Sequence, residues 1–336
     1  MIDSISFKNF KVLRDAQLKL RPFNIIVGPN GSGKSTVFKA LELGKNPHNA
    51  RLDSLKTVGV EANDVELRVK WVSGDIDFTS VDVWNSGGTR RTNLEGSNLN
   101  SPSLSKYQLG IAKLFGELQV YSLDPNKVAE KVQLLPNSQL ARDGSNLAAA
   151  LDNLRDESRA SFHELELELN RWLPEFDSIL FQTPNPGLRS FGLGQVVTQQ
   201  LIRSHDLSEG TLLALALLYI VHNLRPVSVV CLEEPDRGLH PRLLRDLRDA
   251  LYRLSYPDQF GIKREPIQVI ATTHSPYFLD LFKDHPEEII IAEKQPDATA
   301  VFKNLADDKE LIEIIGDAPL GEVWYTGILG GVPLRK

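Results

Sequence analysis

Short runs of alternating hydrophobic and polar residues open the chain, and their period of two predicts β-strands. Residues 5–10 and 12–20 alternate in this way, and Phe23–Val27 is apolar throughout, as expected for a buried strand. A glycine-rich turn follows, and residues 35–43 then show the spacing of a helix. Residues 57–84 return to alternation and are rich in β-branched side chains, which predicts a further group of strands.

The middle of the chain changes to helical spacing. Residues 146–154 and 162–172 place leucine and aromatic side chains three or four positions apart, which predicts two helices. Residues 164–169 also alternate Glu with Leu, so a strand remains an alternative there. Pro174 ends either element. Short strand-like runs follow, and residues 125–205 are expected to form a lobe inserted into the main sheet.

Helices and strands alternate regularly from residue 211 onward. Residues 211–222 predict an apolar helix and residues 244–254 an amphipathic one. Strands are expected at residues 227–232, 267–271, 289–291 and 298–302. Alternation of this kind is typical of an α/β fold. Residues 86–105, by contrast, are rich in Ser, Asn and Gly and are expected to form a flexible loop.

Composition and charge narrow the class of protein. Hydrophobic residues make up 41% of the 336 residues and charged residues 24%, which favours a packed globular chain over a disordered one. The formal charge of -6 argues against a uniformly basic surface for nucleic acid. The most apolar run, residues 212–221, is about half as long as a membrane-crossing helix. The single cysteine, Cys231, and the absence of a signal-like N-terminus favour a cytoplasmic protein without a membrane.

The strongest chemical motif lies between a predicted strand and a predicted helix. Residues 28–35 read GPNGSGKS and fit the phosphate-binding pattern G-x-x-x-x-G-K-[ST]. Its backbone N–H groups and the following helix N-terminus are suited to phosphates, Lys34 to the β- and γ-phosphates, and Ser35 to Mg²⁺, with Thr36 assisting at the α-phosphate. The ATP-binding residues expected in this loop are Gly28, Pro29, Asn30, Gly31, Ser32, Gly33, Lys34, Ser35 and Thr36.

Two adjacent carboxylates end the apolar strand expected at residues 227–232. Carboxyl ends of strands are where α/β sheets bind ligands. Glu233 is expected to hold the Mg²⁺ shell, usually through water, and Glu234 to orient or deprotonate the attacking water. A further strand delivers His274 to the same edge of the sheet, where it is expected to hydrogen-bond the γ-phosphate.

Residues 207–211 (LSEGT) precede the apolar helix and, taken alone, predict only a helix cap at Ser208. In order with the other three motifs they resemble the signature of ABC ATPases. The chain as a whole resembles the RecF/SMC/OLD-like soluble branch of that superfamily, and residues 143–147, 233–241 and 321–333 are similar to bacterial ATPases of the AAA_21 type. The resemblance implies an α/β ABC-ATPase head, a P-loop NTPase with a mixed sheet core, as a single domain over residues 1–336.

The resemblance also implies a head-to-tail dimer, or a higher assembly of dimers, in which the signature of one copy closes over ATP held by another. Ser208, Glu209 and Gly210 would then contact that nucleotide. Glu233 departs from the family's usual Asp, and Glu209 from its usual Gly. The family's Q-loop glutamine has two candidates, Gln119 and Gln133.

Three functions follow from the resemblance. The leading hypothesis is an ATP-gated dimer that regulates a separately encoded effector, a Toprim or HNH nuclease, as in Septu- and PARIS-like antiphage systems. The alternative is a RecF-like clamp on duplex DNA, for which Arg242, Arg245 and Arg248 offer a basic helix face with Asp246 and Asp249 interleaved. A transporter subunit is the least favoured.

Two further expectations concern the rest of the chain. No sustained heptad repeat is present, so no long coiled coil is expected. About sixty residues follow His274, fewer than an ordinary domain contains, so no nuclease domain is expected there. The apolar residues Trp324, Tyr325, Ile328 and Leu329 are interpreted as core packing, with partner docking as the alternative.

Overall fold

A computed structural model describes residues 1–45, 52–57, 64–73, 76–85, 90–96, 115–134, 139–223 and 227–327. The chain divides into two compact units, and each is described by itself. The first unit holds Met1–Val120, Val227–Cys231 and Ser255–Lys336, and the second holds Tyr121–Pro226 and Leu232–Leu254.

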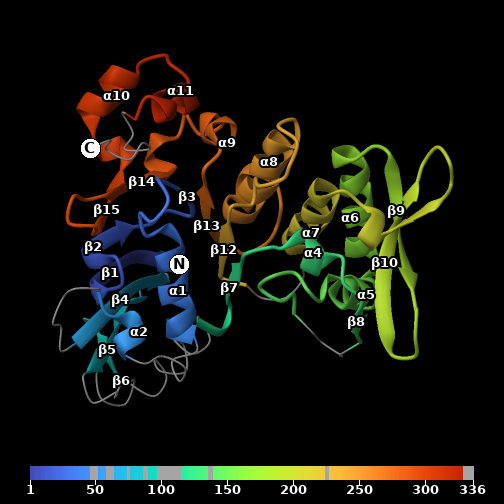
Figure 1. Ribbon diagram of the computed structural model, residues 1–336, viewed down its shortest axis with the longest axis horizontal. Helices are drawn as coiled ribbons and strands as arrows, with labels where there is room; N and C mark the ends of the chain where they lie inside the picture. The colour runs from blue at the N-terminus through green and yellow to red at the C-terminus, as the bar shows by residue number, and fades with distance from the viewer. Residues whose placement is uncertain are drawn as a thin grey trace. The chain divides into compact units, whose positions relative to one another are not determined.

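An antiparallel sheet of five strands begins the first unit, in the order β2-β1-β4-β5-β6 (Figure 1). Its strands are β1 (Ile2–Phe10), β2 (Leu13–Lys19), β4 (Asp64–Ser73), β5 (Ile76–Asn85) and β6 (Arg90–Glu95). The strands predicted around residues 5–20 and 57–84 are confirmed. The loop expected at residues 86–105 is wrong at Arg90–Glu95, because that segment pairs with β5 over its whole length. The rest of that loop, apart from residue 96, lies outside the described residues.

A mixed sheet of six strands carries the candidate chemistry, in the order β15-β14-β3-β13-β12-β7. Its strands are β3 (Phe23–Val27), β7 (Leu118–Tyr121), β12 (Val229–Glu233), β13 (Gln268–Thr273), β14 (Ile289–Lys294) and β15 (Ala300–Asn304). β3 runs parallel to both β13 and β14, whereas β15 is antiparallel to β14. The mixed α/β character expected from the sequence is confirmed.

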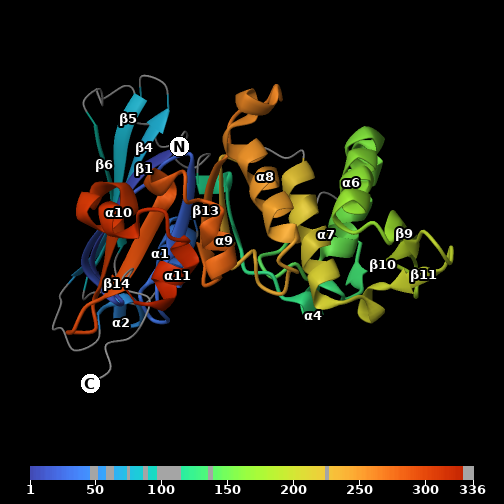
Figure 2. The same ribbon diagram turned by 90° about the horizontal axis from the view of Figure 1, so that it is seen from above.

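Helices of the first unit follow the strand ends. They are α1 (Lys34–Lys45), α2 (Leu52–Leu55), α9 (Pro276–Asp280), α10 (Lys309–Ile315) and α11 (Leu320–Tyr325), with short 3-10 turns at Pro257–Phe260, Pro286–Glu288 and Leu305–Asp307. α9 and α11 pack together (Figure 2). Of the C-terminal apolar residues, Trp324 is half-buried and Tyr325 is 74% exposed. Both interpretations of the C-terminal apolar residues therefore keep some support, and residues 328 and 329 lie outside the described part.

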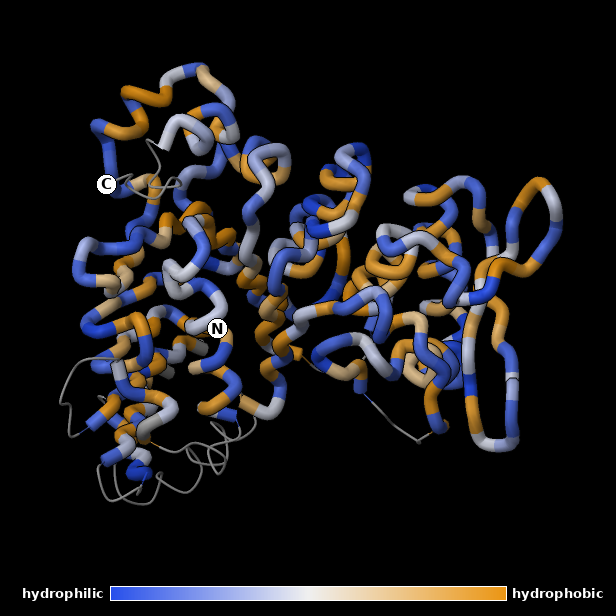
Figure 3. Tube along the Cα trace, in the orientation of Figure 1, coloured by the Kyte–Doolittle hydropathy of each residue, from blue (hydrophilic) through white to orange (hydrophobic). Residues whose placement is uncertain are grey.

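The second unit is built from helices against a small sheet in the order β11-β10-β8, with β9 on β10. Both hydrophobic and hydrophilic residues occur along this part of the chain (Figure 3). Its elements are α4 (Pro125–Val128), β8 (Val132–Gln133), α5 (Leu147–Glu157), α6 (Arg159–Trp172), β9 (Phe176–Gln182), β10 (Leu188–Gln195), β11 (Leu201–Arg203), the 3-10 turn η2 (Ser204–Asp206), α7 (Glu209–His222) and α8 (Leu243–Ser255). Residues 125–205 lie within this unit, which continues through α7 and α8.

Residues 164–169 are helical, so the strand alternative is wrong. Phe162, Leu165 and Leu169 are buried at helical spacing, whereas Leu167, which alternation would also bury, is 48% exposed. α7 is buried nearly all round, as its apolar sequence predicts. The longest helices of the described residues, α6 and α7, have 14 residues each. In that part of the chain no helix is long and apolar enough to cross a membrane.

A buried carboxylate ties α6, α7 and α8 together. Glu168 is 7% exposed, and its two oxygens meet His222 Nε2 at 2.8 Å and the guanidinium of Arg253. Burial opposes ionisation of Glu168, but the hydrogen bonds from His222 and Arg253 outweigh it and lower the pKa of this carboxyl. Removing one member of such a buried group leaves the others without their charged partner.

Glu168→Gln is expected to lower the free energy of unfolding by about 1–3 kcal/mol at neutral pH, because it removes charged hydrogen bonds from a buried site. The folded-state pKa of Glu168 lies below its ordinary value of 4.5, so its contribution is complete above that pH and is lost as the pH falls further. Urea denaturation at neutral pH and at about pH 3.5 should therefore show a smaller difference in acid. Glu164→Gln, exposed on the same helix, is the control. An equal loss in both variants would contradict the role of Glu168.

Candidate functional site

The phosphate loop connects the end of β3 to the start of α1. The N–H of Ser32 donates to the carbonyl of Pro29 at 3.2 Å, and that of Thr36 to Gly33 at 3.0 Å, which starts the helix. A Cβ on Gly28 would collide with the carbonyl of Ala292, and one on Gly33, at φ 91°, would lie 2.8 Å from the Leu13 side chain. Close approach to the backbone therefore requires glycine at position 28, and the left-handed φ favours it at position 33.

The lysine of the loop is held by the loop itself. Lys34 is 6% exposed, and its Nζ donates to the carbonyls of Gly28 at 2.7 Å and Pro29 at 3.0 Å. The side chain thus folds back over the loop and places a buried positive charge beside the backbone that phosphates would meet. Ser35 is exposed and Thr36 half-buried at the first turn of α1.

An unpaired hydroxyl lies inside the same loop. Ser32 is fully buried, and its Oγ has no hydrogen-bond partner in the described structure. Buried polar groups are nearly always paired, so an orphaned hydroxyl inside a loop of this sequence fits a site whose partner is a bound phosphate. Together with Lys34, it makes the loop chemically suited to a nucleotide.

His274 follows β13 at the same edge of the sheet as the phosphate loop. The parallel register pairs Val27 with Thr273, so Gly28 and His274 both come one residue after a matched position. Thr273 accepts a hydrogen bond from the N–H of Ser275 at 2.9 Å, and Ser275 caps α9. The backbone on the C-terminal side of the half-buried His274 is thereby fixed. His274 thus lies at the carboxyl end of β13, and its hydrogen bond to a γ-phosphate stays a prediction.

The paired carboxylates stand at the end of β12, where the chain enters the second unit. Glu233 is the last residue of the strand, and Glu234 has φ 47°. This left-handed backbone is uncommon for a residue other than glycine and is found preferentially at functional sites. β12 begins in the six-stranded sheet next to β13, the strand before His274.

Arg142, which the sequence did not single out, forms an ion pair with Glu233. Its Nη2 lies 3.5 Å from the Glu233 Oε2, and its carbonyl accepts from the N–H of Ser122 at 2.8 Å. The following residue, Asp143, accepts from the N–H of Ser145, and this hydrogen bonding lowers the pKa of Asp143 despite partial burial. Arg142, just before the segment 143–147 that is similar to AAA_21-type ATPases, thus places a positive charge beside Glu233.

The signature residues lie at the exposed N-terminus of α7. Ser208 Oγ accepts from the N–H of Thr211 at 3.2 Å, so the predicted helix cap is confirmed. Ser208 and Glu209 are exposed. A Cβ on Gly210 would lie 2.7 Å from the carbonyl of Gly238, in the turn that follows the carboxylates. Glycine at position 210 therefore lets these two segments of the second unit approach closely.

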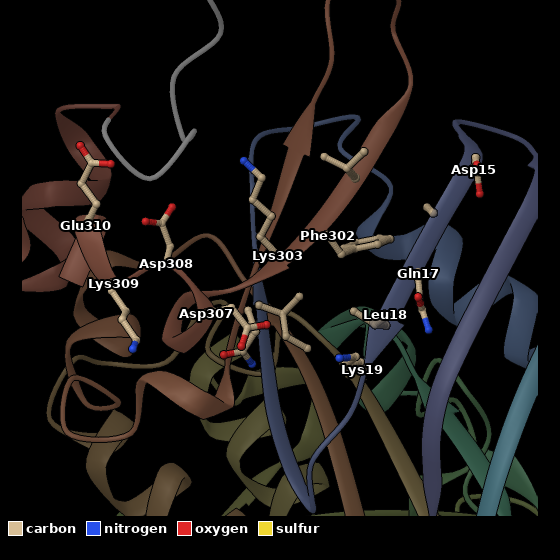
Figure 4. A pocket seen from close by; sticks show the side chains of 14 residues that line it. Asp15, Gln17, Leu18, Lys19, Phe302, Lys303, Asp307, Asp308, Lys309 and Glu310 are labelled. Atoms are coloured by element: carbon tan, nitrogen blue, oxygen red, sulfur yellow. The ribbon is translucent and has the colours of Figure 1, made fainter.

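Other candidate positions are less informative. Gln119 lies in β7 and receives a hydrogen bond of 3.4 Å from Lys45, while Gln133 is exposed in β8, and nothing here distinguishes them as the Q-loop glutamine. A cavity of about 700 Å³ opens between β2, β15 and α10 (Figure 4). Its charges are balanced between lysines and carboxylates, and it contains none of the predicted site residues.

Comparisons with known proteins show which families the chain is similar to. A model described as an AAA ATPase domain matches residues 1–80. The chain is 46% identical over 43 residues to an OLD nuclease of Thermus scotoductus, covering 13% of this chain and 8% of that protein. It is 30% identical over 142 residues to the DNA replication and repair protein RecF of Erwinia tasmaniensis, covering 42% and 32%. The chain thus spans about a third or less of the curated relatives it matches.

Solved structures support the same fold. An SMC head bound to the C-winged helix domain of ScpA superposes with a TM-score of 0.64 at 17% identity, covering 90% of this chain and 96% of that one. The SMC head domain from Thermotoga maritima gives 0.55 at 15% identity, covering 90% and 98%. These likenesses concern the fold.

Fold, phosphate loop and relatives define an ABC-type AAA ATPase of the RecF/SMC/OLD branch. Within that class, the chain belongs to the family described as AAA domain, putative AbiEii toxin, Type IV TA system, whose model matches residues 96–280.

Ser32→Ala is expected to leave the free protein as stable or more stable by up to about 1 kcal/mol, because it removes a buried hydroxyl without a partner. If that hydroxyl serves a bound phosphate, the same change weakens ATP binding several-fold. Fluorescent-nucleotide titration measures this, with Lys34→Ala abolishing binding and Lys39→Ala, exposed on the same helix, leaving it unchanged. A clear loss of stability with unaltered nucleotide affinity would disprove the assignment.

Proposed function

We propose that this chain binds Mg²⁺–ATP at the phosphate loop and hydrolyses it. The observation that carries the proposal is that one loop holds both the buried ammonium of Lys34 and the buried hydroxyl of Ser32, which has no hydrogen-bond partner in the described structure. Lys34 would hold the β- and γ-phosphates, and Ser35 and Glu233 the metal and its water shell. When bound, Mg²⁺ would neutralise part of the negative charge of the phosphates.

Glu234 is proposed to orient the attacking water and accept its proton, and His274 to donate to the γ-phosphate. Two observations support these roles. Glu234 has a left-handed φ, and His274 follows β13 at the same level at which Gly28 follows β3. Arg142 is proposed as a positioning residue, because its ion pair restrains Glu233 before the metal arrives.

A second copy of the chain is proposed to complete the site. Ser208 and Glu209 are exposed at the start of α7, where unpaired backbone N–H groups and the helix dipole favour an anion. In a head-to-tail dimer, this end would cover the γ-phosphate held by the partner's loop. Each dimer would then contain two shared sites, and larger assemblies would be built from such dimers.

Glu234→Gln is expected to bind ATP normally while turnover falls about 10²–10⁴-fold, because only the proton acceptor is removed. With ATP and Mg²⁺ it should accumulate as a dimer by light scattering, whereas nucleotide-free protein should not. Glu130→Gln, an exposed carboxylate of the second unit, is the matched control. Wild-type turnover in Glu234→Gln would exclude the proposed base.

The dimer is proposed to gate a separately encoded effector, such as a Toprim or HNH nuclease in antiphage defence. Two observations support an effector of this kind. The chain resembles an OLD nuclease over one short segment, and its family description names a putative toxin. The alternative is a clamp on duplex DNA, which the RecF relatives favour. Arg242, just before α8, and Arg245, in its first turn, are exposed, whereas Arg248 pairs with Asp249 at 2.6 Å.

One paired experiment separates the two. For an effector gate, the product of the adjacent reading frame should co-purify with the Glu234→Gln variant in ATP, and less well with Lys34→Ala. For a clamp, duplex DNA should bind only with ATP, weaken steeply with salt and weaken further in Arg242→Ala/Arg245→Ala. If nothing co-purifies and DNA does not bind with ATP, both functions are contradicted. The proposed ATPase activity would be unaffected by that result.

A further inference from the structure

A second cavity, separate from the phosphate loop, lies wholly within the second unit. It measures about 530 Å³ and is bounded by the end of α4, the strands β9 and β10, and the turn η2. Thr183 and Ser190 add hydroxyl groups to its lining. Its volume is within the range of small-molecule sites.

The charge of this cavity is one-sided. Lys131, Arg203 and His205 line it, and its lining contains no Asp or Glu. The carboxylate of Asp206 lies outside the lining, with its Oδ2 3.5 Å from His205 Nε2. The larger cavity beside β2 mixes three lysines with four carboxylates, so basic charge is not a general property of hollows on this chain (Figure 4). In a protein with a formal charge of -6, three cationic or protonatable side chains around one cavity favour an anionic ligand.

Residues 203–205, which line this cavity, lie just before the signature loop, residues 207–211. Ser204 is 3% exposed, and its hydroxyl donates to the carbonyl of Ala129 at 2.8 Å, which fixes the turn η2 against the end of α4. The N–H of Leu207 donates to the Ser204 carbonyl, and Ser208 follows. A ligand held by Arg203 and His205 is therefore a few residues from the cap of α7.

We propose that this cavity binds a phosphate-bearing small molecule that acts on the signature loop. A guanidinium fork, an ammonium, an imidazole and hydroxyl groups are the donors that phosphate oxygens accept. Lys131, Arg203 and His205 line one cavity of about 530 Å³, a volume that suits a small molecule better than an extended nucleic-acid strand. The cavity does not include Lys34, so binding to it can be measured without ATP, whereas an effect through the signature loop rests on the proposed function.

Calorimetric titration of inorganic pyrophosphate into Lys34→Ala protein tests the proposal, because that background silences the phosphate loop. Saturable binding at one site per chain is expected. Arg203→Ala and Lys131→Ala should each weaken it about tenfold, as expected for loss of a charged hydrogen bond. Arg203→Lys should weaken it less. Arg159→Ala, exposed in the same unit outside the cavity, should leave the affinity unchanged.

Absence of saturable binding, or pyrophosphate affinity that neither Arg203→Ala nor Lys131→Ala changes, would overturn the proposal. Both side chains are exposed, so thermal melts should show that the variants fold normally. A single-stranded oligonucleotide that binds in an Arg203-dependent way, where pyrophosphate does not, would also overturn it by identifying a nucleic-acid strand as the ligand.

Discussion

The close approach of the phosphate loop to the neighbouring strand β14 is the constraint on which the chemistry of the first unit depends. The parallel register pairs Val27 with Ile291, so Gly28 meets Ala292 directly, and its missing side chain is what permits the contact. The carbonyls of Gly28 and Pro29 are then turned toward Lys34 and hold its ammonium. A buried cation and an unpaired hydroxyl are costly for the free protein, and a bound triphosphate would repay that cost.

The second unit depends on a similar approach between two backbones. Gly210, at the start of α7, lies against the carbonyl of Gly238, so the signature loop and the turn after the carboxylates are held together. The far end of α7 is fixed to α6 and α8 by the hydrogen bonds of Glu168. With its body buried and its C-terminal end secured, α7 presents Ser208 at an exposed end. This is the arrangement that binding a phosphate from outside the chain would require.

Local patterns made much of this predictable. Phe23–Val27, the glycine-rich turn and the helix after it are encoded within a few consecutive residues, and the structure follows them closely. Interactions between distant segments were not predictable. Arg142 and Glu233 are 91 positions apart, and no local period indicates that they meet. The strand β6 was missed because its polar sequence resembles a loop, and only pairing with β5 makes it a strand. The helix α6 was ambiguous until burial showed which leucines face the core.

The central claim is that the two halves of one ATP site come from different chains. Co-expression of two tagged variants, Lys34→Ala and Ser208→Arg, followed by purification on both tags, tests it most directly. Each variant alone should be inactive, because every site in its own dimer carries the defect. The mixed dimer should regain one intact site of its two, and so about half of the wild-type turnover. A mixed dimer with no turnover, or full activity of Ser208→Arg alone, would show that the site does not form between two copies.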